Sequence, residues 1–110
     1  MEKFEYCFES TVYVHTKGAL DSLTSKPFVD ELSKRMEHAD EPLYILDMQD
    51  VDFMNSLGLA AIIKLWKTAQ VHNRTLRILT NPRIANIFRV SHLDTIIDLY
   101  VMERLQQSNE

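Results

Sequence analysis

Cysteine and glycine are both scarce in this chain of 110 residues, which has one cysteine and two glycines. The single Cys7 cannot form an internal disulfide, and this favours a protein of the reducing cytoplasm. Gly18 and Gly58 are isolated, so the chain has no glycine-rich loop of the kind that cradles nucleotide phosphates. The sequence therefore gives only a weak indication of nucleotide binding.

Positive charge and long apolar runs are also limited. The chain has 12 Lys and Arg residues against 16 Asp and Glu residues, which disfavours binding to nucleic acid or to an anionic membrane. No apolar run approaches the roughly 20 residues that span a bilayer, and the first residues show no cationic and apolar leader. We expect a cytoplasmic protein with one domain over residues 1–104 and a polar tail over residues 105–110.

Residues for metal binding or catalysis are not grouped in the sequence. A serine hydrolase needs Gly-x-Ser-x-Gly around its nucleophile, but Met54 holds the place of the first glycine before Ser56. Asp47 could be the phosphoacceptor of a receiver domain, but the acidic pair expected after the first strand is missing. An enzyme is therefore not expected, and no metal or other cofactor is expected, because the histidines lack metal-ligand spacing. They are His15, His38, His72 and His92.

The first half of the chain is predicted to form a β-hairpin and a helix. Aromatic and polar residues alternate over 4–9, and β-branched and aromatic residues fill 12–16, so both segments are predicted strands. Gly18 is expected to end the second strand. A helix is predicted over 25–38, with Ser25 as its cap and a proline in its first turn.

The second half alternates strands and helices. Residues 43–46 form a nearly continuous apolar run that ends at Asp47, as in a strand buried on both faces. The next predicted elements are a helix over 56–72, a strand over 76–79, a helix over 82–90 capped by Asn81, and a last strand or the approach to a terminal helix over 95–100. This order predicts an α/β fold, with helices packed on a mainly parallel sheet.

Functional residues in such a sheet gather at the carboxyl ends of the strands. Here those ends hold residues 18–21, 47–56 and 80–81. Ser56 lies where a strand gives way to a helix, where backbone N–H groups are expected to lack partners and the helix dipole is positive. A phosphate there would add roughly −1.5 to −2 charges to a surface with Asp50 and Asp52. The simpler interpretation is that Asn55 or Ser56 only caps the helix.

Four segments of the chain resemble the STAS domain family, which includes bacterial anti-sigma factor antagonists. Residues 18–21, Gly-Ala-Leu-Asp, are similar to the family's Gly-Glu-Leu-Asp, and residues 46–59 cover its central motif, Phe-Met/Ile-Asp-Ser-Ser/Thr-Gly-Leu-Gly. The similarity continues over residues 76–82 and 92–94. The resemblance implies the STAS fold, in which an opening hairpin is followed by alternating helices and strands.

The resemblance also implies a phosphorylation-controlled partner switch. In the family, a partner kinase phosphorylates the first serine of the central motif, and Ser56 has that place. The chain departs from the motif at Asn55 in place of Asp, at Leu57 in place of Ser or Thr, and at Ala19 in place of Glu. Leu57 removes a second hydroxyl, which leaves Ser56 as the candidate acceptor. Phosphate on Ser56 is expected to block docking of a partner.

The implied partners are a serine kinase of the anti-sigma factor type and a serine phosphatase, or one protein that has both activities. A downstream protein is the third implied partner. The chain is similar to SypA-type single-domain STAS regulators of bacterial biofilm formation, which work beside such a bifunctional protein. The expected docking surface is the loop 50–55 and the first turn of the following helix, with Asp21 and Asp47 beside the phosphosite. Its expected contact residues are Asp50, Asp52, Met54, Asn55, Leu57 and Gly58. An unmodified STAS scaffold and a nucleotide-sensing interaction module are the alternatives.

Overall fold

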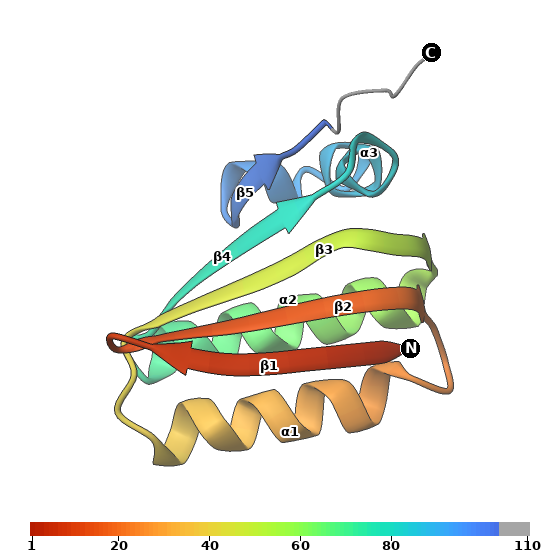
Figure 1. The fold of residues 1–110 in the computed structure, drawn as a ribbon. Helices are drawn as coiled ribbons and strands as arrows, with labels where there is room; N and C mark the ends of the chain where they lie inside the picture. Colours follow the sequence, from red (N-terminus) through yellow and green to blue (C-terminus); the bar gives the residue numbers. More distant parts are fainter. Residues whose placement is uncertain (104–110) are drawn as a thin grey trace.

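A computed structural model describes residues 1–103, which form a five-stranded sheet with the strands in sequential order (Figure 1). The first two strands are antiparallel, and the other three pairings are parallel. The predicted α/β fold with a mainly parallel sheet is therefore confirmed. The predicted tail, residues 105–110, lies outside the described residues. The elements are β1 (Glu2–Phe8), β2 (Thr11–Leu20), α1 (Ser25–His38), β3 (Leu43–Met54), α2 (Ser56–Val71), β4 (Thr75–Thr80), α3 (Pro82–Val90), the short 3-10 helix η1 (Leu93–Thr95) and β5 (Asp98–Val101).

Two strands are longer than the sequence predicts. β2 does not end at Gly18, which has φ +102° and lies beside a register shift between β2 and β3. The glycine thus allows a bulge inside the strand, because it adopts positive φ without a steric penalty. β3 continues to Met54, so residues 50–54 are strand and not the expected loop.

The ends of the other elements follow the predictions with two differences. Thr24, not Ser25, holds the N-cap position of α1, and its side chain makes no capping hydrogen bond. Residues 98–101 form strand β5, so of the two alternatives for the segment 95–100 the strand is correct. No helix within residues 1–103 is long and apolar enough to cross a lipid bilayer.

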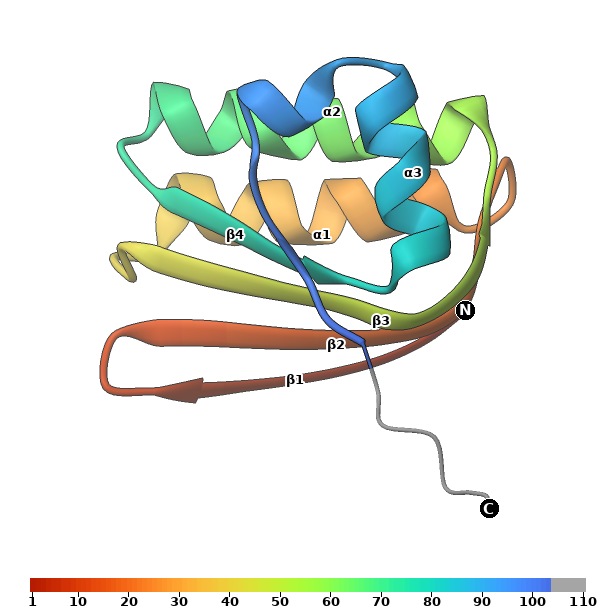
Figure 2. The same ribbon diagram turned by 90° about the horizontal axis from the view of Figure 1, so that it is seen from above.

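Helices α1 and α2 lie side by side on one face of the sheet (Figure 2). They share this face because right-handed crossovers between sequential neighbouring strands place successive helices on the same side. Alternate residues of the central strands point toward them and are buried, and Ile62 and Leu65 of α2 complete this core. The strand residues of the core are Val12, Val14, Tyr44, Leu46, Met48 and Ile78.

Candidate functional site

The carboxyl ends of β2 and β3 meet at the start of α2. Leu20 and Met54 form the last residue pair of the two strands, and the Asn55 backbone N–H donates to the Leu20 carbonyl over 3.3 Å. The loop that follows Leu20 therefore lies beside the first turn of α2. Two of the segments predicted to share one edge of the sheet, residues 18–21 and 47–56, do come together there.

Asn55 caps helix α2. Its side-chain oxygen accepts hydrogen bonds from the backbone N–H groups of Leu57 (3.1 Å) and Gly58 (3.0 Å). The interpretation of Ser56 as the cap is therefore wrong, because Ser56 is the first residue inside the helix. The expectation of unpartnered N–H groups is wrong for these two donors, since both donate to the Asn55 side-chain oxygen.

Ser56 is exposed, and its hydroxyl has no hydrogen-bond partner within residues 1–103. Since Asn55 satisfies the helix terminus, modification of Ser56 would break no capping interaction. The hydroxyl lies at the N-terminus of a helix of 16 residues, where the helix dipole favours negative charge. A phosphate would therefore be tolerated by the fold at this position.

Gly58 and Met54 are buried, so the expectation that both contact a partner directly is wrong. A Cβ atom on Gly58 would collide with the Leu20 carbonyl oxygen and lie 2.8 Å from Met54 Cγ. Gly58 is thus the residue that lets α2 pass closely over the end of β2. Both residues shape the site from beneath its surface.

Exposed apolar side chains occur on the segments that meet near Ser56. Leu57 and Phe53 are about half exposed and Leu23, in the loop before α1, is largely exposed. The sequence reasoning missed Leu23 and Phe53. The sequence does contain a signal for Phe53. Successive strand residues point to opposite faces, so Phe53 points outward when its neighbour Met54 points inward. A shallow groove between α1 and α2 begins at Leu57, and its apolar lining comprises Val29, Ala60 and Ala61.

Asp21 directly follows Leu20, whose carbonyl accepts from the Asn55 N–H, and the Asp21 carboxylate is engaged in the local turn. One oxygen accepts from the backbone N–H of Leu23 (3.0 Å) and of Thr24 (3.2 Å). The hydrogen bond from Leu23, followed by those from Thr24, holds the pKa of Asp21 below its ordinary value. Asp21 therefore stays ionised and fixes the loop that presents Leu23.

Asp47 does not flank Ser56, and the expectation that it does is wrong. It lies in the middle of β3, and the seven residues of extended strand from Asp47 to Met54 span roughly 20 Å. Its buried carboxylate accepts hydrogen bonds from the Tyr13 hydroxyl and from the backbone N–H of Gln49 (3.0 Å). Asp47 therefore belongs to a structural network of the sheet.

Asn81, which follows the last residue of β4, forms hydrogen bonds with the backbone of β3. Its side-chain N–H₂ group donates to the carbonyls of Gln49 (3.0 Å) and Val51 (2.9 Å), and its side-chain oxygen caps α3 at Ile84. The last β3–β4 pair is Met48 with Thr80, so Asn81 replaces the missing strand neighbour. This is a role that sequence reasoning, which assigned only the cap, did not find.

A hollow beside Asn81 has an acidic lining that includes Asp50 and Asp52, with Arg83 at its edge. Asp50 also contacts His15 of β2, with 2.7 Å between the His15 Nε2 and the Asp50 Oδ2. The carboxylates disfavour the phosphates of a nucleotide in this hollow. Within residues 1–103, no three His, Cys, Asp or Glu side chains are grouped closely enough to hold a metal ion.

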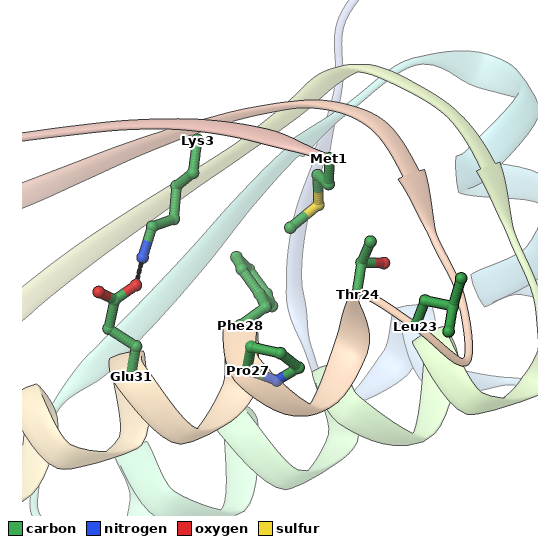
Figure 3. A pocket seen from close by; sticks show the side chains of 7 residues that line it. All are labelled: Met1, Lys3, Leu23, Thr24, Pro27, Phe28 and Glu31. Atoms are coloured by element: carbon green, nitrogen blue, oxygen red, sulfur yellow. Dashed lines mark ion pairs between the residues drawn. The ribbon is translucent and has the colours of Figure 1, made fainter.

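A second hollow, between the start of β1 and the first turns of α1, is mostly apolar (Figure 3). Lys3 and Glu31 form an ion pair inside it, and Phe28 and Met1 line it. Because the charges of Lys3 and Glu31 are paired with each other, the hollow is a packing seam between β1 and α1.

The comparison with known families decides the family. Residues 9–102 match the family described as the Mlab, STAS domain. The chain belongs to the STAS domain family. The structures of STAS relatives support the fold. An anti-sigma factor antagonist from Mycobacterium paratuberculosis is 16% identical, with a TM-score of 0.79, over 90% of this chain and 84% of that chain.

Two further structures are forms of one protein that differ in phosphorylation. The Bacillus cell fate determinant SpoIIAA in its phosphorylated form is 16% identical, with a TM-score of 0.72, over 96% of this chain and 94% of that chain. Unphosphorylated SpoIIAA, an anti-sigma factor antagonist, is 14% identical, with a TM-score of 0.67, over 94% of this chain and 90% of that chain. At such identities the likeness shows the STAS fold and leaves the role of Ser56 to its own geometry.

Proposed function

We propose that this STAS domain is a phosphorylation-controlled partner-switching regulator of the anti-sigma factor antagonist type, with Ser56 as the phosphoacceptor. The observation that carries the proposal is the free, exposed Ser56 hydroxyl at a helix terminus already capped by Asn55. A kinase could modify this group without disturbing the fold. The phosphorylated and unphosphorylated structures of SpoIIAA, a protein of the same fold, add support.

The switch would act by changing the charge of an apolar docking surface. We define this surface as Leu23, Phe53 and Leu57, the exposed apolar residues on the segments that meet near Ser56. A dianionic phosphate placed among them must be desolvated when a partner docks, and burial of an unpaired charge costs several kcal/mol. Since about 1.4 kcal/mol already changes affinity tenfold, docking would be lost without a change of fold.

Charged and polar residues at the rim would set the orientation of the partner. Asp52 is exposed, Asn55 and Asp50 are half-buried, and all three lie at the same end of β3 as Ser56. They stay in the proposed contact set, together with Leu57. Met54 and Gly58 leave it, because both are buried.

The proposed partners are a serine kinase of the anti-sigma factor type and a phosphatase that removes the phosphate, or one protein with both activities. The third proposed partner is a downstream protein that binds the unmodified form. Bacterial signalling, with biofilm control as one instance, is the proposed setting. In this role the chain is a binding module and not an enzyme. The alternative is an unmodified STAS scaffold, which the experiment below would favour if the two Ser56 variants bind the partner equally.

The test is affinity capture from native cells with the Ser56→Ala and Ser56→Asp variants, each quantified against the unchanged chain. Ser56→Ala should retain the downstream partner, and Ser56→Asp should lower its recovery. The matched controls are Ser91→Ala and Ser91→Asp, since Ser91 is an exposed serine directly after α3 and outside the docking surface. Equal recovery by both Ser56 variants would contradict the switch.

A further inference from the structure

The free edge of the sheet is formed by β1, a regular strand of seven residues. All seven residues pair with β2 without a bulge, and the strand contains no proline. Natural edge strands usually carry such irregularities, or outward charges, because an unpaired row of N–H and C=O groups is a template for another strand. The backbone of β1 therefore lacks the bulge or proline that commonly protects an edge strand.

The side chains of β1 divide sharply between the two faces of the sheet. On the face opposite α1 and α2, β1 carries Glu2 and three aromatic residues, and 62% of Phe4, 49% of Tyr6 and 68% of Phe8 is exposed. The Tyr6 ring lies 5.7 Å from the Phe4 ring and 5.1 Å from the Tyr13 ring, measured between centroids. This row of rings is thus ordered before any partner binds.

Lys3 and Glu5 point to the other face, where charged residues of α1 pair with them. Arg35 of α1 donates to Glu5 over 2.8 Å, and Lys3 pairs with Glu31. Figure 2 shows α1 lying over the face of the sheet and leaving the outer edge of β1 open. Charge therefore does not prevent a second strand from approaching this edge.

We propose that two copies of this chain dimerise by antiparallel pairing of their β1 strands, with Tyr6 on the two-fold axis. In this register Phe4 lies opposite Phe8 of the second copy, and Tyr6 lies opposite Tyr6. Aromatic cross-strand pairs stabilise antiparallel strands. The edge is thus complementary to itself.

Neighbouring registers are less favourable. A two-fold axis at Glu5 would oppose the two Glu5 carboxylates, and like charges directly opposite in a sheet are destabilising. An axis at Cys7 would place Phe4 opposite Ser10, which lies in the turn after β1. Charge and aromatic pairing therefore select Tyr6 as the centre.

The dimer leaves the Ser56 surface free. β1 begins at the end of the sheet where β2 ends, since Glu2 pairs with Lys17. Antiparallel pairing places the start of β1 near the end of the second β1, so the two Ser56 surfaces lie at opposite ends of a continuous ten-stranded sheet. Each copy could then dock a partner independently.

Sedimentation velocity of the full chain, from about 1 to about 500 µM, tests the dimer. We expect a monomer–dimer equilibrium, with a dissociation constant at least tenfold higher for Tyr6→Lys. Tyr100→Lys is the matched control and should not change it, because Tyr100 is 45% exposed on the other edge strand, β5. A monomer at every concentration, or dissociation by Tyr100→Lys instead, would overturn the proposal.

A disulfide experiment tests the register and does not require that Tyr6→Lys folds. Opposite residues in antiparallel strands have Cα atoms about 4.5–5.5 Å apart, within the range that a disulfide spans. In a Cys7→Ser background, Tyr6→Cys should give a covalent dimer on mild oxidation, and Phe8→Cys should stay monomeric. Equal linking by both, or none by Tyr6→Cys, would contradict the register.

Discussion

Gly58 allows α2 to pass over the end of β2, because a methyl group in its place would meet the Leu20 carbonyl and Met54. Gly58→Ala should lower the free energy of unfolding by about 1–3 kcal/mol, the usual effect of overpacking, although alanine favours helix. Urea denaturation followed by circular dichroism measures this. The control is Lys64→Ala on the exposed side of α2, with an expected change within about 0.5 kcal/mol. Equal stability of Gly58→Ala and the unchanged chain would contradict the close approach.

Tyr13 supports the buried Asp47 carboxylate through its hydroxyl. Tyr13→Phe removes one donor from a buried acceptor, so the free energy of unfolding should fall by about 1–3 kcal/mol. Tyr100→Phe, at an exposed tyrosine of the same sheet, should change it little. A loss as small for Tyr13→Phe as for Tyr100→Phe would show that the hydrogen bond contributes no stability.

The same tyrosine predicts a pH dependence. Burial, followed by the hydrogen bond to Asp47, raises the pKa of Tyr13 far above its ordinary value of 10.0. Above that pH the unfolded chain releases the Tyr13 proton and the folded chain keeps it, so the free energy of unfolding falls as pH rises. Chemical denaturation between pH 8 and about pH 11 should show a smaller fall for Tyr13→Phe. Identical slopes for the two proteins would contradict this assignment.

Asn55 caps the N-terminus of α2, and the adjacent Ser56 takes no part in that capping. Asn55→Ala should cost about 1 kcal/mol, since it removes the acceptor for Leu57 and Gly58. Asn55→Asp retains the acceptor and adds a negative charge, worth about 0.3–1 kcal/mol at the positive end of a helix. Ser56→Ala should be nearly neutral. Thermal unfolding ranks the three variants, and a large loss for Ser56→Ala would contradict the assignment of the cap.

The elements of the fold were largely readable from local patterns. Alternating residues in 4–9 and 12–16, the apolar run 43–46 and the cap at Asn81 each predict an element that the structure contains. The ends of β2 and β3 were not readable, because they depend on pairing with each other. In the sequence, Gly18 is typical of a residue that ends a strand. In the structure, β2 stays paired with β3 beyond Gly18, and the positive φ of Gly18 lies beside a bulge.

The candidate site was predictable in position and less so in its parts. The position of Ser56 at the start of a helix follows from the change from strand to helix periodicity in the sequence, and Ser56 is exposed in the structure. The burial of Met54 and Gly58 and the distant position of Asp47 depend on three-dimensional packing, which spacing along the chain does not show. Leu23 was missed for the same reason, since its loop joins the site only through the contact of Leu20 with Asn55.

The whole domain divides its surface between the faces and ends of one sheet. α1 and α2 bury one face (Figure 1), the aromatic row of β1 lies on the other, and Ser56 begins α2 directly after the end of β3. In the proposed switch, a charge added at Ser56 would therefore change the docking surface and leave the core and the β1 edge unaffected. Such a switch would need no conformational change.

Phosphopeptide mass spectrometry of the chain recovered from its native cells, with and without the suspected kinase, tests the switch most directly. Ser91→Ala serves as the control, because it removes a different exposed serine. The account predicts phosphate on Ser56 that disappears without the kinase and persists in Ser91→Ala. The absence of phosphate from Ser56 while the kinase is active would contradict the switch and indicate an unmodified interaction module.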